Sequence, residues 1–113
     1  MTEFDALLLS VAIEGPLAFA VVAFARWPCR GPRHVAIATM LATAVTHPQL
    51  WSASLWLYPR IGYWPTVGCA EALVILVEAA IIAWAAGLSP VRALTVSGIA
   101  NGASTLTGLA LLA

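Results

Sequence analysis

The sequence predicts an all-α, polytopic membrane protein: four transmembrane helices in a compact antiparallel bundle. Two observations predict this class. Of the 113 residues, 62% are hydrophobic and only 9% are charged, whereas soluble domains usually carry about 25% charged residues. Mean hydropathy is +0.95. Because a spanning helix needs about 20 residues, four spans and short turns use the whole chain, residues 1–113, as a single domain.

The four expected spans are residues 5–25, 35–56, 66–86 and 91–112. Pro16 lies inside the first and Pro48 inside the second, where each removes a backbone donor and favours a bend. The third span is expected to end at Gly87, and the fourth to begin with Pro90 in its first turn. An aromatic turn is expected over residues 58–65, with its tyrosines in the interfacial belt.

Arginine placement predicts the orientation. Four arginines lie at the first and third turns and one lies at the second: Arg26, Arg30, Arg33 and Arg92 against Arg60. Because basic turns stay in the cytoplasm, both termini are expected outside it, which is an N-out/C-out arrangement. The first span begins with acidic residues and lacks a basic leader, so we interpret it as a retained span. The expected location is the bacterial inner membrane.

Polar residues inside the apolar runs define what we call the polar seam: Glu14, His47, Glu71, Glu78 and Asn101. Glu71 and Glu78 are seven residues apart, about two helical turns, so they share a helix face. At about 1.5 Å per residue, the seam spans the midplane and the outer half of the bilayer. Ionisable groups in hydrocarbon are costly and usually face protein. We therefore expect these five side chains to face one another or a neighbouring subunit, and the carboxyls to stay largely neutral.

Small residues of the fourth span favour close helix packing. Gly98 and Gly102 form a G-x-x-x-G pattern, which allows two membrane helices to approach closely. Ser97 and Ser104 lie on an adjoining polar stripe of the same helix and are expected to pack against other helices.

These features leave three functional interpretations. The leading one is a non-enzymatic accessory subunit or assembly component of a larger membrane complex, because no extramembrane domain and no catalytic motif is evident. The second is a small proton- or cation-coupled transporter that uses the intramembrane glutamates. The third is a metal- or tetrapyrrole-binding bundle that uses His47. The sequence requires no cofactor. Expected partners are the lipid bilayer and other membrane subunits or a second copy, and no basic face suggests nucleic acid.

Overall fold

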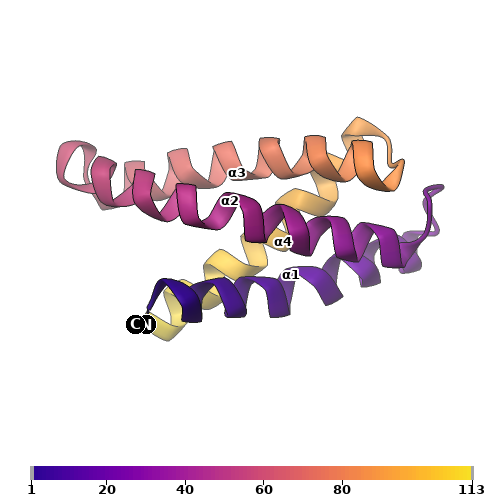
Figure 1. Ribbon diagram of the computed structural model, residues 1–113, viewed down its shortest axis with the longest axis horizontal. Coiled ribbons are helices and arrows are strands. Elements are labelled where there is room, and N and C mark those ends of the chain that lie inside the picture. The colour runs from indigo at the N-terminus through magenta and orange to yellow at the C-terminus, as the bar shows by residue number, and fades with distance from the viewer. Residues whose placement is uncertain (1, 113) are drawn as a thin grey trace.

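The computed structural model describes residues 2–112 and is a bundle of four helices. They are α1 (Glu3–Ala25), α2 (Pro32–Ile61), α3 (Tyr63–Ala86) and α4 (Pro90–Leu112). Helices α1 and α3 each pack against both α2 and α4, so α1 lies diagonally across the bundle from α3 (Figure 1). The predicted all-α, four-helix architecture is confirmed.

Local sequence signals set most of the helix ends. Thr2 caps α1: its hydroxyl accepts the backbone N–H of Asp5 at 3.1 Å, and the Asp5 carboxylate accepts the backbone N–H of Thr2 at 3.1 Å. Gly87 ends α3 in the left-handed region with φ 69°, and Pro90 begins α4. The roles predicted for these two residues are confirmed. Glycine suits the end of α3 because it has no Cβ that would clash in the left-handed conformation. Proline suits the start of α4 because the first residue of a helix has no intrahelical acceptor for a backbone N–H.

The turn predicted over residues 58–65 is wrong. Helix α2 continues through Pro59 to Ile61, and α3 begins at Tyr63, so Gly62 alone connects them. Gly62 adopts φ 91°, which side chains other than glycine rarely tolerate. Pro65 is the third residue of α3, where a backbone N–H has no intrahelical acceptor, so its ring does not interrupt the helix. Pro16 and Pro48 likewise lie within continuous helices.

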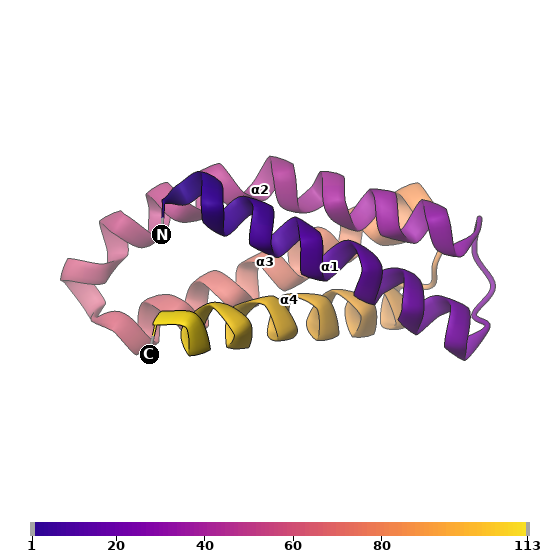
Figure 2. The ribbon, with the colours of Figure 1, turned by 90° about the horizontal axis from the view of Figure 1, so that it is seen from below.

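The two ends of the bundle differ. Both chain ends and the Gly62 connection lie at one end, which we call the open end; the α1–α2 and α3–α4 connections lie at the other, the arginine end (Figures 1 and 2). At the arginine end, Arg30 ties the α1–α2 connection to the end of α3. Its backbone N–H donates to the carbonyl of Ala86 at 2.8 Å, and its guanidinium donates to the carbonyl of Ala85 at 3.0 Å. These bonds provide donors for carbonyls at the end of α3, which have no backbone N–H partner within the helix.

The large apolar side chains lie mostly on the outside of the bundle. Phe24 is 94% exposed and Trp84 is 82% exposed. The buried apolar residues are instead mainly alanine and valine, with Ile82 and Leu88 the largest. Helices α1 and α3 are long and apolar enough to cross a membrane, with mean hydropathies of 2.2 and 2.1 over their most apolar windows. Most of each window is not buried in the bundle, unlike the core helix of a soluble protein.

The half of the bundle next to the arginine end is filled by a continuous apolar core, which we call the sealed half. Its residues come from all four helices and the connection before α4: Ala18, Val22, Val35, Ala38, Ala79, Ile82, Ala86, Leu88, Ala93 and Val96. Ile82 and Ala86 are fully buried within it. The polar residues of the interior therefore lie beyond this core, toward the open end.

Candidate functional site

A polar cavity lies among the four helices beyond the sealed half, and we call it the chamber. Its volume is about 160 Å³. All five residues of the polar seam line it: Glu14 from α1, His47 from α2, Glu71 and Glu78 from α3, and Asn101 from α4. Five hydroxyl residues complete its polar wall: Ser10, Thr43, Thr46, Ser104 and Thr105. The structure thus brings together side chains that the sequence places on four separate helices.

The centre of the chamber is a bridge between two glutamates on diagonal helices. Glu14 and Glu78 are each only 1% exposed. The hydroxyl of Thr43, on α2 between them, lies 2.8 Å from Oε1 of Glu14 and 3.0 Å from Oε1 of Glu78. We call this arrangement the Glu14–Thr43–Glu78 bridge. Both distances are ordinary for hydrogen bonds between oxygen atoms.

The number of protons available constrains the bridge. A threonine hydroxyl has one proton, so Thr43 can donate to only one of the two carboxyl oxygens. The second contact becomes a hydrogen bond only if that carboxyl carries a proton and donates it to Thr43. If both carboxylates were ionised, the Thr43 oxygen would face one of the two carboxylate oxygens with no hydrogen between them, and the two oxygens would repel each other. The geometry therefore fits a pair of glutamates that holds at least one proton.

Two further hydroxyls hold the outer oxygens of the pair. Ser104 on α4 lies 3.0 Å from Oε2 of Glu14 and 3.2 Å from the carbonyl of Asn101. Thr46 on α2 donates to the carbonyl of Ala42 at 2.9 Å and lies 3.4 Å from Oε2 of Glu78. With its proton used on the carbonyl, the Thr46 hydroxyl can accept a hydrogen bond from a protonated Glu78 carboxyl. The chamber can thus accommodate a proton on more than one carboxyl oxygen.

Ser97 and Asn101 connect α4 to α3. The Ser97 hydroxyl donates to the carbonyl of Ile75 at 2.8 Å across the helix interface. The Asn101 amide donates back to the carbonyl of Ser97 at 2.9 Å and to its hydroxyl at 3.2 Å. This small network positions the face of α4 that carries Ser104 toward Glu14. Ser104, expected only to pack, also contacts the carboxyl pair.

His47 lies at the edge of the chamber. Its ring stacks on Trp51, with centroids 5.9 Å apart and an angle of 26° between the planes. Its Nδ1 atom is buried and has no hydrogen-bond partner among residues 2–112. No group of three His, Cys, Asp or Glu side chains in that same part of the chain is placed to hold a metal ion. His47 therefore offers one imidazole at the edge of the chamber, without further metal-binding side chains grouped around it in the described residues.

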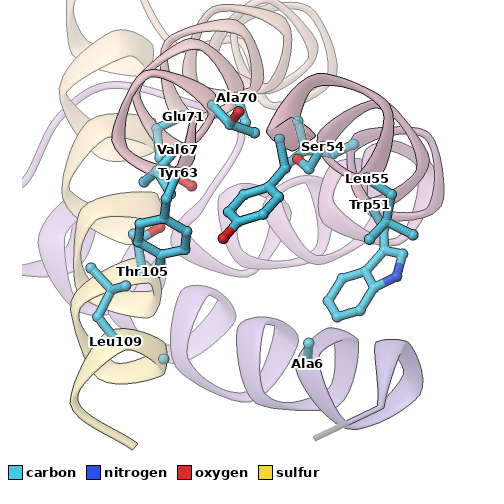
Figure 3. A pocket seen from close by; sticks show the side chains of 14 residues that line it. Ala6, Trp51, Ser54, Leu55, Tyr63, Val67, Ala70, Glu71, Thr105 and Leu109 are labelled. Atoms are coloured by element: carbon cyan, nitrogen blue, oxygen red, sulfur yellow. The ribbon is translucent and has the colours of Figure 1, made fainter. Parts of the chain in front are cut away.

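A second, larger cavity opens from the chamber toward the open end, and we call it the vestibule. Its volume is about 630 Å³. It shares Leu50, Glu71 and Thr105 with the chamber wall, so the two cavities adjoin. Tyr58 and Tyr63 line it, instead of acting only as the interfacial belt expected for them, and Figure 3 shows Tyr63 beside this space. The chamber thus adjoins the vestibule toward the open end and the apolar core of the sealed half on the other side.

Among residues 2–112, no basic side chain lines the chamber with its glutamates. Arg26 and Arg30 lie in the α1–α2 connection, Arg33 and Arg92 lie in the first turns of α2 and α4 at the arginine end, and Arg60 lies in the last turn of α2 at the open end. There, Arg60 lies over the ring of Trp56, 4.0 Å from its centroid, and donates to its carbonyl. Protons or an incoming cation must therefore balance the charge of the carboxyls.

Gly98 and Gly102 do not form a close helix crossing within the described chain. A Cβ atom added at either position would have no neighbouring atom within 4 Å. Both lie on a face of α4 that is only partly buried. The G-x-x-x-G pattern therefore does not explain how α4 packs inside the bundle.

The sequence interpretation did not name Thr43 as a site residue, although Thr43 holds the carboxyl pair together. A signal was present: Thr39, Thr43 and His47 recur every four residues on one stripe of α2, the stripe that faces the chamber. No comparable pattern marks Tyr58 and Tyr63 as vestibule residues. Comparison of the chain with protein-family models, with curated proteins and with solved structures found no match.

Proposed function

We propose that the chain is an integral membrane protein that crosses the bilayer four times. The outward faces of α2 and α4 support this, because they carry large exposed apolar side chains, including Leu41, Leu55, Val91 and Leu106. Five polar residues that lower the hydropathy of these two helices are buried in the interior: Thr39 and Thr43 of α2, and Ser97, Asn101 and Ser104 of α4. The bundle is 43 Å long, close to the thickness of a bilayer with its headgroup regions, about 40–45 Å.

The proposed orientation places the arginine end in the cytoplasm and the open end, with both termini, on the other side. The distribution of four arginines against one supports this by the positive-inside rule. Trp27, whose ring lies 5.5 Å from the guanidinium of Arg92, fits a membrane interface at the arginine end. The membrane we propose is the bacterial inner membrane.

Within that membrane, we propose that the protein is a non-enzymatic, proton- or cation-coupled carrier. One observation carries this proposal: the Glu14–Thr43–Glu78 bridge, which fits a shared proton, is buried in a chamber that adjoins a vestibule. A purely structural role, in which the carboxyls only join helices, would not require a cavity beside them. Buried carboxyls that face a water-accessible space at membrane depth are the usual elements of proton coupling.

The expected chemistry is an exchange of a cation against the shared proton. A cation that arrives through the vestibule opposes the shared proton by its charge, because no arginine lies in the chamber to balance an ionised carboxyl. Binding of the cation releases the proton to the open end, and reprotonation releases the cation. Movement across the membrane additionally requires the sealed half to part, so that the chamber is reached from the two sides in turn.

Reconstituted vesicles test this function. The purified protein would be inserted into liposomes that contain a pH-sensitive dye, and gradients of Na⁺, K⁺ or an organic cation would be imposed in turn. We expect at least one gradient to change the internal pH faster than in protein-free vesicles. Glu14→Gln and Glu78→Gln should each reduce that rate to the protein-free value, because an amide cannot release a proton.

The matched control is Glu3→Gln, since Glu3 is an exposed glutamate at the start of α1 and contacts neither cavity. It should leave the flux unchanged. Flux that persists in both Glu14→Gln and Glu78→Gln would contradict the role of the bridge. Wild-type rates equal to those of protein-free vesicles for every cation would contradict the carrier itself.

The second candidate is the accessory subunit suggested by the sequence. The hydrogen bonds that join α1, α2, α3 and α4 around Glu14 support a purely structural role for the polar seam. A partner would then meet the apolar exterior, because Glu14, Glu78 and Asn101 of the seam are buried inside the bundle. Extraction in mild detergent, followed by native mass spectrometry, separates the candidates: stoichiometric recovery with larger subunits favours the accessory role.

A further inference from the structure

We infer that the vestibule binds a lipophilic organic cation of single charge, with the charge placed at Glu71 and the apolar body among the aromatic rings of the vestibule. This inference rests on the proposed carrier function and names the class of its substrate. The vestibule, at about 630 Å³, falls within the range of small-molecule sites, about 300–1,000 Å³. All four helices contribute to its wall, as residues such as Ala6, Trp51, Tyr63 and Leu109 show (Figure 3).

The lining is apolar and aromatic around one ionisable group. Trp51, Tyr58 and Tyr63 supply three rings, and the two tyrosine rings meet edge to face with centroids 6.1 Å apart. Glu71 is the only charged residue among those that line the wall, and Figure 3 shows it on the same side of α3 as Val67 and Tyr63. Aromatic faces attract cations, and a carboxylate adds a counter-ion. This combination suits an ammonium or phosphonium group attached to a hydrophobic body.

Other ligand classes fit the lining less well. An anion would meet Glu71 without a basic partner, because no arginine or lysine lines the vestibule and Arg60 is held over Trp56. A zwitterion would leave its own carboxylate unpaired in the same way. A sugar would need polar partners over most of its surface, whereas the vestibule offers five hydroxyl side chains among apolar ones, and that of Thr66 already donates to the carbonyl of Gly62 at 2.6 Å. Unpaired polar groups in an apolar site are costly.

Glu71 also explains how such a cation would be coupled to the proton of the carboxyl pair. It lines both cavities, so a charge bound there lies between the vestibule and the Glu14–Thr43–Glu78 bridge. A positive charge beside the chamber stabilises the ionised form of the pair by Coulomb attraction, which is strong where water is scarce. Binding at Glu71 would therefore favour release of the shared proton.

A binding comparison between two probes of the same shape and opposite charge tests this inference. Tetraphenylphosphonium and tetraphenylborate would be titrated into the purified full-length protein in detergent, with protein-free micelles as the blank, and followed by calorimetry. We expect saturable binding of the phosphonium and none of the borate above the blank. Glu71→Gln should weaken phosphonium binding by about tenfold or more, because it removes the counter-ion.

Glu3→Gln is the matched control and should bind as the wild type does. Tyr63→Ala, which removes an exposed ring at the vestibule and leaves Glu71 in place, should weaken phosphonium binding several-fold. This variant, together with the charge preference of the wild type, decides the question if Glu71→Gln does not fold. Equal binding of both probes, or wild-type phosphonium affinity in a folded Glu71→Gln protein, would overturn the inference.

The outcomes also separate this inference from the carrier function. Phosphonium binding that depends on Glu71, without any flux in vesicles, would leave the site standing and remove the carrier. Flux driven by an inorganic cation, with no phosphonium binding, would leave the carrier standing and remove the organic substrate.

Discussion

The sealed half of this bundle and the half next to the open end, which we call the open half, are built from the same four helices. Their interiors contain different kinds of side chain. The sealed half buries alanine, valine, isoleucine and leucine, and Arg30 joins the α1–α2 connection to the end of α3. The open half buries Glu14 and Glu78 and contains the chamber and the vestibule. Buried carboxyls and cavities reduce stability, because polar groups lose water and packing contacts are lost.

The difference indicates a division of roles between packing and chemistry. The sealed half contributes an apolar core that holds the helices in place. Its small side chains allow the helices to approach one another closely, as they do in membrane proteins. The open half departs from that pattern where the carboxyls lie, and local departures from optimal packing are typical of functional sites. The sealed half is therefore the scaffold on which the chamber is held.

The largest effect concerns which end faces the cytoplasm. A reporter enzyme that is active only outside the cytoplasm, fused to the C-terminus, should be active, whereas a fluorescent protein that folds only in the cytoplasm should be dark there. The arginines of the other end are the physical reason. The reverse result would mean that the vestibule opens to the cytoplasm and that the sealed half lies on the non-cytoplasmic side.

The next effect tests whether the sealed half supplies the stability. Ile82→Ala should lower the free energy of unfolding in detergent by about 2–5 kcal/mol, because Ile82 is fully buried and its loss leaves a cavity. Ile37→Ala is the matched control: Ile37 is 57% exposed on α2, and its change should stay within about 0.5 kcal/mol. Similar losses in both variants would show that the core is not the stabilising element.

The smallest effect tests the bridge in the open half. Thr43→Val keeps the shape of the side chain and removes the only hydroxyl between Glu14 and Glu78. We expect it to lower the free energy of unfolding by about 1–3 kcal/mol, because buried carboxyl oxygens lose a partner. It should also slow the proton flux in vesicles.

Thr39→Val provides the comparison for that change. Thr39 is equally buried on the same stripe of α2, but its hydroxyl donates only to the carbonyl of Val35 in its own helix, at 2.7 Å. Its replacement should lower the free energy of unfolding by only about 0.5–1 kcal/mol, less than that of Thr43, and should leave the flux intact. If the two valine variants behave alike, the Thr43 hydroxyl has no special part in the bridge.

The sequence by itself determined the helical class, the number of helices and several of their ends. Long apolar runs leave little alternative to helices, and Gly87 and Pro90 favour termination and initiation through local backbone sterics. Spacing also placed polar residues on common faces, because the helical period is the same in any context. The turn at residues 58–65 was predicted wrongly, because prolines near helix ends cost little and do not always end a helix.

Only the tertiary structure decided which of those faces meet. Glu71 and Glu78 share a face of α3, yet Glu78 contacts Thr43 of the bridge while Glu71 lies where the chamber meets the vestibule. The partner of Glu78 across Thr43 is Glu14, from the diagonal helix and 64 positions away in the chain. The rotation and depth of each helix depend on the packing of all four together, and no local spacing in the sequence encodes them.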